Sequence, residues 1–326
     1  MSVTVTTPAR LHLGFLDLNG SLGRRFGSIG LSVSSPRTRL TVRSAARSEV
    51  AGPDSERARS HLATLQQSLG LAGAYRVTVE EAIPPHAGLG SGTQLALALA
   101  AALRRLHDLP RDARADALRL RRGARSGVGV GLFDHGGVVV DGGHGAETDV
   151  APIVSRVPFP ERWRIIVVLD PAAQGLHGPD ESQAFATMPA FSDAAAAQLC
   201  RLVLMQALPS LVECDLAGFG AAITAMQHIL GDHFAPMQGG SRFTSAAVGA
   251  CLKTLAQAGA QAIGQSSWGP TGFAFTASAD EAARLAALAR QDSAGRGLDI
   301  RVCTGLNHGA NITAHNFQSA SVTTDR

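Results

Sequence analysis

The chain has 326 residues, 45% of them hydrophobic and 17% charged, which is enough for two globular domains with a sizeable core. The net charge is only +3, and no dense basic run with interleaved aromatic residues occurs, which argues against a nucleic-acid partner. None of the four cysteines stands in a CxxC pair, and the eleven histidines form no HxxxH or HxH pair, so neither zinc nor a disulfide framework is expected.

The N-terminal residues and the hydrophobic runs bear on the location of the protein. The sequence MSVTVTTPAR alternates as a strand does and lacks the apolar core of a signal peptide. No apolar run approaches the roughly 18 residues that a membrane helix needs. We therefore expect a cytoplasmic protein with reduced thiols and no membrane partner.

Strands and helices alternate in the predicted first half of the chain. A helix is expected over Ser55–Leu69, where apolar residues recur at helical spacing, and a second from about Thr93 to Leu106. The segment Phe133–Gly136 is interpreted as the approach to a hairpin. Strands are expected at Val3–Thr6, Leu31–Val33, Arg39–Arg43, Arg76–Glu80 and Val138–Asp141.

The proline-containing segment Val157–Pro160 is predicted to link two domains, residues 1–157 and 158–326. The second half is expected to be α+β, with helices on one face of a sheet, and its polar tail from about His315 is expected to fray. The expected helices are Asp193–Val212, Asp215–Ile229, Thr244–Ala258 and Ala279–Arg290. The expected strands are Ile165–Leu169, Gln261–Gly264, Gly272–Thr276 and Ile300–Thr304.

The segment Ile83–Leu106 carries the most informative motif of the chain, a glycine-rich turn that leads into an Ala/Leu helix. Glycines let the backbone approach a ligand closely, and a helix start presents unpaired N–H groups and a positive dipole end. Together they favour a phosphate site over a simple tight turn. The residues expected to bind phosphate are Gly88, Leu89, Gly90, Ser91, Gly92 and Thr93.

Other nucleotide-binding motifs are absent from the sequence. A Walker loop needs a lysine directly after its glycines, and the one lysine of the chain, Lys253, is far away. No clean strand runs into the glycines, and no acidic residue follows about 20 positions on, so no nicotinamide cofactor is expected. The standard phosphoribosyltransferase loop, in which two acidic residues follow an apolar strand, is absent as well.

The glycine loop resembles the phosphate loop of the GHMP superfamily of small-molecule kinases, whose pattern is roughly Pro-x-x-x-Gly-Leu-Gly-Ser-Ser. Residues Pro85–Gly92 fit this pattern, with Gly92 in place of the second serine. Thr7–Gly14 is similar to the first motif of the superfamily, and Gly264–Gly272 lies where a third glycine-rich loop belongs. The resemblance implies an α+β, GHMP-kinase-like fold, with an S5-like N-terminal domain and a ferredoxin-like C-terminal domain.

Three runs resemble one branch of the superfamily, the β-ribofuranosylaminobenzene 5′-phosphate synthases. They are residues 8–33, 125–144 and 265–271. These enzymes join phosphoribosyl pyrophosphate to 4-aminobenzoate with loss of CO2 and pyrophosphate, in the biosynthesis of methanopterin-type carriers. The resemblance implies these two small-molecule substrates, Mg²⁺ and a homodimer, and it implies no ATP.

The segment Ser126-Gly127-Val128-Gly129 separates this branch from the kinases. In many superfamily kinases the segment is Ser-Gly-x-Asp, and the aspartate is the catalytic base. Gly129 takes its place here, which removes a group typically worth about 10²–10⁴-fold in rate and favours a reaction whose nucleophile is an arene carbon. Ser126 and Gly127 are still expected to contact the substrate. An ATP-dependent kinase and a noncatalytic ligand sensor are the alternatives.

Arg10, His12 and Asp17 are the candidate catalytic residues. Arg10 and His12 are two apart on a predicted strand and so share a face, and Asp17 follows in a turn. They could hold a phosphate, a carboxylate and a metal, or they could belong to a polar edge strand. Because the first motif lines the cleft in the superfamily, the resemblance favours function. The candidate magnesium ligands are Asp17, Asp134 and Asp141, each of which could equally be a turn or capping residue.

The second half contributes further candidates. Trp268 could stack on the aromatic ring of the substrate, or it could be a core residue. Arg242 could bind the substrate carboxylate or the 5′-phosphate, or it could be solvated. Asp180 and Glu181 could line the cleft or cap a helix. The residues expected to close the cleft are Ser266, Ser267, Trp268, Gly269 and Thr271.

Overall fold

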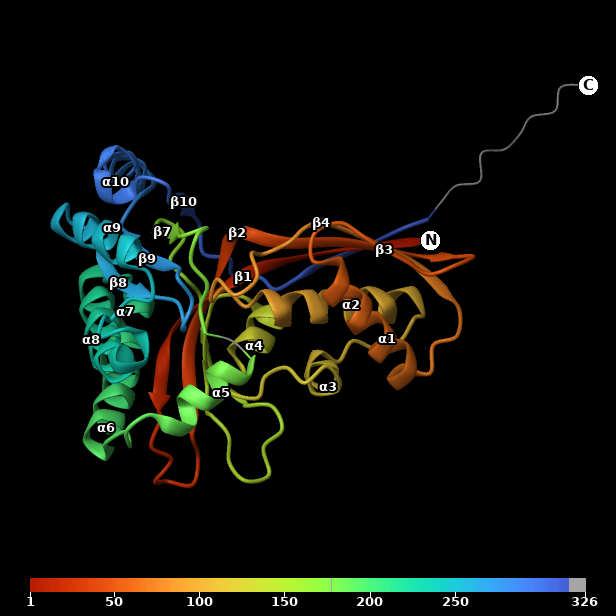
Figure 1. Ribbon diagram of the computed structural model, residues 1–326, viewed down its shortest axis with the longest axis horizontal. Coiled ribbons are helices and arrows are strands. Elements are labelled where there is room, and N and C mark those ends of the chain that lie inside the picture. The colour runs from red at the N-terminus through yellow and green to blue at the C-terminus, as the bar shows by residue number, and fades with distance from the viewer. Residues whose placement is uncertain (177, 317–326) are drawn as a thin grey trace, which may run out of the picture.

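A computed structural model of the protein describes residues 1–176 and 178–316. Within these residues the strands form one seven-stranded and one four-stranded sheet, and helices pack on both (Figure 1). The tail that was expected to fray lies outside the described residues from 317 onward. The structure thus has the two-part α+β organisation that the sequence predicted.

Two long antiparallel strands, β1 (Ser2–Asp17) and β2 (Phe26–Ala45), form the centre of the first sheet. Both are much longer than the sequence predicted. The sheet order is β11-β1-β2-β4-β3, and β5 pairs with β2 and β6 with β5; the β3–β4 pair is parallel. The other strands are β3 (Glu49–Ala51), β4 (Ala74–Glu81), β5 (Val138–Asp141), β6 (Ile153–Val157) and β11 (Asn311–His315).

Four helices cover one face of this sheet (Figure 1). They are α1 (Ser55–Leu69), α2 (Ser91–Leu106), α3 (Ala113–Arg119) and α4 (Val128–His135). The hairpin interpretation of Phe133–Gly136 is wrong, because residues 133–135 are the last turn of α4. The glycines of α4 disfavour a helix in isolation. In the folded protein, Gly131 lets α4 pack closely, because a Cβ at this position would lie only 2.6 Å from Ile153 Cδ1.

The second sheet has the antiparallel order β10-β7-β9-β8 and confirms all four predicted strands. Helices cover both of its faces, so the expectation of helices on one face is wrong. The reason is the continuous apolar run of β7: Ile166 and Val168 pack with α9 and α10, whereas Ile165 and Val167 face the core that contains α8. The strands are β7 (Arg164–Leu169), β8 (Gln261–Gln265), β9 (Gly272–Thr276) and β10 (Asp299–Cys303).

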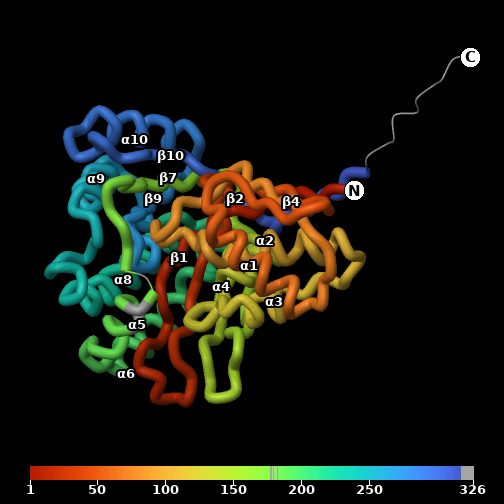
Figure 2. Tube along the Cα trace, turned by 45° about the vertical axis from the view of Figure 1, so that its right-hand side comes forward, coloured from red at the N-terminus to blue at the C-terminus, as the bar shows by residue number. Residues whose placement is uncertain are grey.

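The helices of the second part agree with the predicted ones, with one addition, α5, which lies beside β1 between the two parts (Figures 1 and 2). They are α5 (Gly178–Thr187), α6 (Asp193–Leu202), α7 (Leu208–Val212), α8 (Leu216–Phe234), α9 (Ala246–Gln257) and α10 (Ala279–Gln291). A π-helical turn, Val203–Ala207, joins α6 to α7, and short 3-10 turns lie at Ala235–Gln238 and Ser293–Gly295.

The helical stretch Asp193–Val212 has the length and hydropathy of a membrane-spanning helix, so the expectation that no apolar run approaches that length is wrong. Core helices of globular proteins have the same property. One side of the stretch is in the core, through Leu199 and Leu211. Leu204 and Met205 lie on the outside with 65% and 69% of their surface exposed.

The two parts of the chain are interleaved. The last strand, β11, pairs with β1 in the first sheet, so residues 158–326 do not all belong to the second sheet. Conversely, Leu13 and Phe15 near the end of β1 belong to the same core cluster as Phe219 and Ile223 of α8. β1 is therefore part of both cores.

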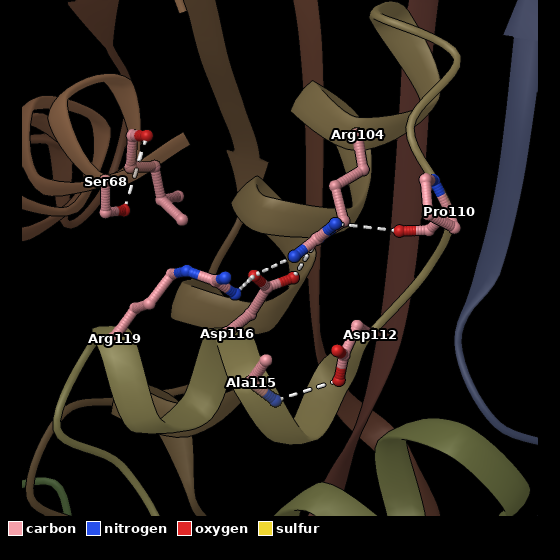
Figure 3. Close-up of polar contacts among 8 residues, drawn as sticks. Ser68, Arg104, Pro110, Asp112, Ala115, Asp116 and Arg119 are labelled. Atoms are coloured by element: carbon pink, nitrogen blue, oxygen red, sulfur yellow. Dashed lines mark hydrogen bonds and ion pairs between the residues drawn. The ribbon is translucent and has the colours of Figure 1, made fainter. Parts of the chain in front are cut away.

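Arg104 illustrates how an arginine is buried for structural reasons in this protein (Figure 3). Its guanidinium donates two hydrogen bonds to the Asp116 carboxylate, at 2.6 and 2.8 Å, and one to the Pro110 carbonyl at 2.8 Å. Burial of such a charge is tolerated because the charge is paired and hydrogen-bonded. The pair joins α2 to α3.

The glycine loop, Gly88–Gly92, packs directly against the backbone of the second part. A Cβ on Gly88 would overlap the Ser266 carbonyl oxygen and lie 2.9 Å from Gly269 Cα. The Gly88 carbonyl accepts hydrogen bonds from Ser266 Oγ at 2.7 Å and Arg10 Nη1 at 2.9 Å. At the glycine loop, the two parts therefore meet largely through backbone, to which the Ser266 side chain adds a hydrogen bond.

We expect Gly88→Ala to lower the melting temperature more than Gly239→Ala. Both glycines have a left-handed φ, +77° and +68°, so both variants lose about 1–2 kcal/mol to backbone strain. A Cβ on Gly239 meets open space, whereas on Gly88 it also drives the two loops apart. Thermal unfolding of both variants measures the difference, and equal losses would contradict the tight contact.

Candidate active site

A cavity of about 510 Å³ opens beside the glycine loop, between β1 and the start of α2. Its lining includes most of the phosphate-binding and strand residues that the sequence predicted. The lining residues are Arg10, His12, Phe15, Arg57, His86, Gly88, Gly90, Ser91, Gly92, Thr93, Arg121, Arg122, Gly123, Ala124, Arg125, Ser126, Gly178, Glu181 and Ser267. Five of these are arginines, so the cavity is suited to an anionic ligand.

The predicted loop-to-helix geometry of the glycine loop is present. Gly88 and Gly90 both have φ +77°, and α2 begins at Ser91 with no side chain capping its first turn. The amide groups of Thr93 and Gln94 donate to the Gly90 carbonyl. Leu89 is buried in the core and does not line the cavity. A helix start that no side chain caps is a favourable place for phosphate oxygens.

Arg10 is attached to the glycine loop by its backbone and by its side chain. Its amide donates to the Leu89 carbonyl at 3.0 Å, and its Nη1 to the Gly88 carbonyl at 2.9 Å. Its buried Nε has no hydrogen-bond partner among the described residues. Burial lowers the pKa of Arg10 to about 10, against the opposing effect of Glu181, so the group stays charged at neutral pH.

His12 lies deeper in the same wall, with 2% of its surface exposed. Burial, with a smaller contribution from Arg10, holds its pKa well below 6.5, so the imidazole is neutral at neutral pH. Its Nε2 has no hydrogen-bond partner in the described part of the chain. The His12 amide donates to Ser266 Oγ at 3.0 Å, so Ser266 joins β1 to the glycine loop.

A second cationic group lies at the other end of the glycine loop. A Cβ on Gly92 would lie 3.0 Å from Arg122 Nη1 and 3.2 Å from Arg57 Nη1, so both guanidiniums converge on the start of α2. Arg57 also forms an ion pair with Asp54. His61 is 3.4 Å from Arg122, and burial, then Arg122 and Arg57, lower its pKa to about 4. We call Arg57 and Arg122 the arginine pair, and His61 its histidine.

Asp141 supports the wall of the cavity from behind. Its fully buried carboxylate accepts hydrogen bonds from Ser28 Oγ, Ser126 Oγ and the amides of Gly127 and Gly143. Ser126 itself lines the cavity, and Gly127 lies just behind it. The carboxylate thus fixes the turn before α4 and has its oxygens engaged.

The three candidate magnesium ligands do not come together. Asp17 accepts the amides of Asn19 and Gly20 in a turn at the far end of β1, about 15 Å beyond His12 along the strand. Asp134 is paired with Arg111 at 2.7 Å. No group of three or more His, Cys, Asp or Glu residues suited to a metal occurs in the part of the chain that the structure describes. Neither Asp17 nor Asp134 lines the cavity.

Aromatic side chains gather beside His12. Trp268, with 4% of its surface exposed, stacks on Phe185 of α5 at 4.6 Å between ring centroids, and Phe234 meets it edge-on at 4.9 Å. Phe15, which lines the cavity, contacts Phe185 at 6.1 Å. We call Phe15, Phe185, Phe234 and Trp268 the aromatic cluster. Trp268 Nε1 is buried without a partner among the described residues.

The remaining predicted residues of the second part take different places. Ser267 lines the cavity, and Gly269 packs on the glycine loop. Thr271 is buried beside them, and its carbonyl accepts the Ser266 amide at 2.9 Å. Arg242 lines a separate small cavity behind His12, and both Asp232 oxygens engage its guanidinium at 2.5 and 2.9 Å.

Sequence reasoning missed the arginine pair and its histidine. The signal was present as the run RRGARSG at residues 121–127, which places Arg121, Arg122 and Arg125 directly before Ser126. No role was assigned to these three arginines from the sequence. Arg57 had no such signal, because it appears as one charged residue on an amphipathic helix. Glu181, which the sequence analysis expected either to line the cleft or to cap a helix, lines the cavity and forms an ion pair with Arg125 at 2.6 Å.

Two domain families match the chain: GHMP kinases N terminal domain over residues 57–142, and GHMP kinases C terminal over residues 207–291. The structure resembles a homoserine kinase from Cytophaga hutchinsonii with a TM-score of 0.67, at 16% identity, covering 96% of this chain and 97% of that one. The fold is that of the GHMP kinases, and the glycine loop lies where the sequence motif predicted it.

Two relatives define the family more narrowly. The chain is 32% identical over 282 residues to the beta-ribofuranosylphenol 5′-phosphate synthase of Archaeoglobus fulgidus, covering 83% of this chain and 86% of the relative. It is 29% identical to that of Methanothermobacter thermautotrophicus, covering 95% and 98%. The chain belongs to this family of synthases within the GHMP superfamily, and it is an enzyme. The resemblance in the three sequence runs is thereby confirmed.

The low pKa of His61 predicts a pH-dependent stability. The unfolded chain binds a proton near pH 6.5, whereas folded His61 binds one only near pH 4, so stability falls as the pH falls between these values. His61→Gln keeps a hydrogen-bond acceptor for Arg122 but cannot titrate. Between pH 7 and pH 5, the free energy of unfolding measured in urea should fall by roughly 1–2 kcal/mol less in the variant than in the wild type. An equal loss would show that His61 is not held neutral.

Proposed function

We propose that the protein transfers the phosphoribosyl group of phosphoribosyl pyrophosphate to a para-substituted benzoic acid, with release of CO2 and pyrophosphate. The observation that carries this proposal is the cavity itself. It joins a glycine loop and five arginines to a wall next to an aromatic cluster, while the kinase base is replaced by Gly129. A Cβ on Gly129 would already lie 3.2 Å from Thr93 Cγ2, so an aspartate there would crowd the glycine loop.

The arginines and the glycine loop would bind the phosphates of the donor. Arg10 has a buried Nε beside Gly90 without a partner among the described residues, and no side chain caps the start of α2. Positive groups placed on the departing pyrophosphate stabilise the charge that develops as its bond to the ribose breaks. We assign this role to Arg10, Gly90 and Ser91, and it gives Arg10 the catalytic part that the sequence suggested.

The acceptor would lie against the aromatic cluster. Phe15 of this cluster lines the cavity and supplies aromatic surface for an aryl ring, with Phe185 and Trp268 packed behind it, and neutral His12 supplies a polar atom in the wall between ring and donor. Holding the ring carbon next to the anomeric carbon of ribose is the main contribution of the protein to such a reaction. We therefore assign Trp268 to the acceptor side, and we propose that Ser267, which lines the cavity, helps to close it there.

The chemistry balances without a protein base. The bond between the anomeric carbon and pyrophosphate breaks with oxocarbenium character, as in glycosyl transfer. The ring carbon that bears the carboxylate forms the new carbon–carbon bond. Loss of CO2 from that carbon returns an electron pair to the ring and restores aromaticity. No proton is gained or lost, so the absence of a carboxylate at Gly129 costs nothing.

The para substituent distinguishes two versions of the acceptor. The sequence resemblance implies an amino group, as in 4-aminobenzoate, whereas the name of the relatives specifies a ribosylated phenol, which corresponds to 4-hydroxybenzoate. Either group donates electrons to the ring carbon that attacks. We propose the reaction class and leave both acids as substrates to be compared in one assay.

Magnesium would enter with the donor. Glu181 is an acidic side chain in the lining, and Mg²⁺ is commonly held by one or two carboxylates together with substrate phosphates. A lining with this one carboxylate thus fits an ion that is bound mainly by pyrophosphate. When bound, the ion would neutralise charge on the leaving group; Asp141, whose oxygens are engaged, is a poor candidate ligand.

Incubation with Mg²⁺, phosphoribosyl pyrophosphate and carboxyl-labelled 4-aminobenzoate or 4-hydroxybenzoate should release labelled CO2 and pyrophosphate in equal amounts. The more active acid identifies the acceptor. Phosphorylation of an alcohol by ATP without CO2 release would replace this proposal with a kinase. Binding without turnover would favour a ligand sensor.

We also propose that the enzyme is a cytoplasmic homodimer that buries the exposed side of the Asp193–Val212 stretch. Leu204, Met205 and Val212 are 65–70% exposed, and clustered apolar surface of this kind marks association sites. Light scattering should give twice the chain mass of 33.7 kDa, and Met205→Glu should give the mass of one chain. Leu22→Glu, at an 89% exposed leucine elsewhere, is the control. A monomeric wild type would refute the dimer.

A further inference from the structure

The arginine pair differs from a structural arginine of the same protein. In Arg104, all three guanidinium nitrogens donate hydrogen bonds: Nε and Nη2 to the Asp116 carboxylate, and Nη1 to the Pro110 carbonyl (Figure 3). Arg122 instead has a buried Nε without a hydrogen-bond partner among the described residues, and its Nη2 only approaches a histidine at 3.4 Å. A buried guanidinium with unmet donors is costly, so such a group indicates a ligand that completes it.

The charges around the pair leave an excess of positive charge. Arg57 and Arg122 approach the same point beside Gly92, and Asp54 neutralises one of them. His61, the other titratable group in contact, is neutral at pH 7. Burial, and then repulsion by Arg57, lower the pKa of Arg122, against the opposing effect of Asp54. Two guanidiniums at the start of a helix match a phosphate group.

The glycine loop orders the contents of the cavity. Gly88 packs on the Ser266–Gly269 backbone beside Trp268, Gly90 lies against Arg10, and Gly92 lies against the arginine pair. The loop therefore runs from the aromatic cluster, past Arg10, to Arg57 and Arg122. Under the proposed reaction, the pyrophosphate must be next to the acceptor ring, because the anomeric carbon joins that ring. The other phosphate of the donor then belongs at the far end.

We propose that Arg57 and Arg122 form the subsite for the 5′-phosphate of the phosphoribosyl donor. This assignment rests on the proposed function and adds to it that different arginines bind the two phosphate groups of the donor. Arg10 acts on the group that leaves, and the arginine pair on the phosphate that stays with the product. The pair would bind substrate and product alike, so it sets affinity for the donor rather than the rate of bond formation.

Binding of two half-ligands tests the assignment. Ribose 5-phosphate carries only the remote phosphate, and inorganic pyrophosphate only the leaving group. By calorimetry, Arg122→Ala and Arg57→Ala should each raise the dissociation constant of ribose 5-phosphate about 10- to 100-fold, because a hydrogen bond to a charged group is lost. The dissociation constant of pyrophosphate should stay within about threefold of the wild-type value. Arg10→Ala should show the opposite pattern. Arg59→Ala, an exposed arginine of the same helix outside the lining, is the matched control.

Kinetics give a second measurement. Arg122→Ala should raise KM for phosphoribosyl pyrophosphate about 10- to 100-fold with kcat nearly unchanged. Arg122→Lys should recover part of the affinity. Because Arg122 forms no ion pair among the described residues, its alanine variant should melt no lower than the wild type. A lower melting temperature with unchanged ribose 5-phosphate binding would mean a structural role and overturn the proposal.

The outcomes separate this inference from the proposed function. Loss of pyrophosphate binding alone in Arg122→Ala would place the leaving group at the pair and reverse the assignment. Equal loss of both ligands would show a general electrostatic effect and also overturn it. Selective loss of ribose 5-phosphate, with no CO2 release by the wild type in the labelled assay, would support the subsite and reject the synthase reaction.

Discussion

The backbone contact between Gly88 and the Ser266–Gly269 turn is the constraint on which the site depends. It fixes the glycine loop against the second part of the molecule with almost no side-chain volume between them. Ser266 adds hydrogen bonds to both β1 and the loop. The glycine loop and the aromatic cluster thereby become neighbours, although about 180 residues separate Gly88 from Trp268 in the chain. A side chain at Gly88 or Gly269 would separate the two halves of the cavity.

Partnered and unpartnered arginines divide the positive charge of the protein by role. Arg104 and Arg242 have their donors met by carboxylates, and each joins two segments of the chain. Arg10 and Arg122 line the cavity, and each keeps a buried nitrogen without a partner in the described structure. The free enzyme bears this electrostatic cost. An anion that enters the cavity relieves it, so the folded protein is biased toward a phosphorylated ligand before any substrate arrives.

Local patterns in the sequence predicted the elements well. The helix over Ser55–Leu69 and the strand over Val138–Asp141 have the expected bounds, because spacing and flanking glycines determine them. The lengths of β1 and β2 were missed, since polar residues interrupt their alternation. The helix α4 was missed as well, since glycines there serve close packing against Ile153 rather than helix propensity.

The site was predictable to the extent that it is local. The glycine loop, Arg10 and His12 lie in short motifs, and all reach the cavity. Asp17 belongs to the same motif, but an extended strand carries it away. The pairing of Arg57 with Arg122 was not predictable, because Arg57 lies on α1 and Arg122 in the turn after α3, and only the folded chain brings them together. The three candidate magnesium ligands lie on different elements, and the fold keeps them apart.

The pairing of β11 with β1 has a consequence for the order in which the protein can fold. Residues 2–6 take residues 311–315 as partners, so β1 obtains its outer neighbour only after about 300 further residues of the chain have been synthesised. Until then one edge of β1 is open, with Val3 and Val5 dependent on the rest of the first sheet for cover. The N-terminal sheet cannot be completed as an early, independent unit during synthesis. Its final closure is a contact of very high sequence separation, and contacts of this kind form slowly.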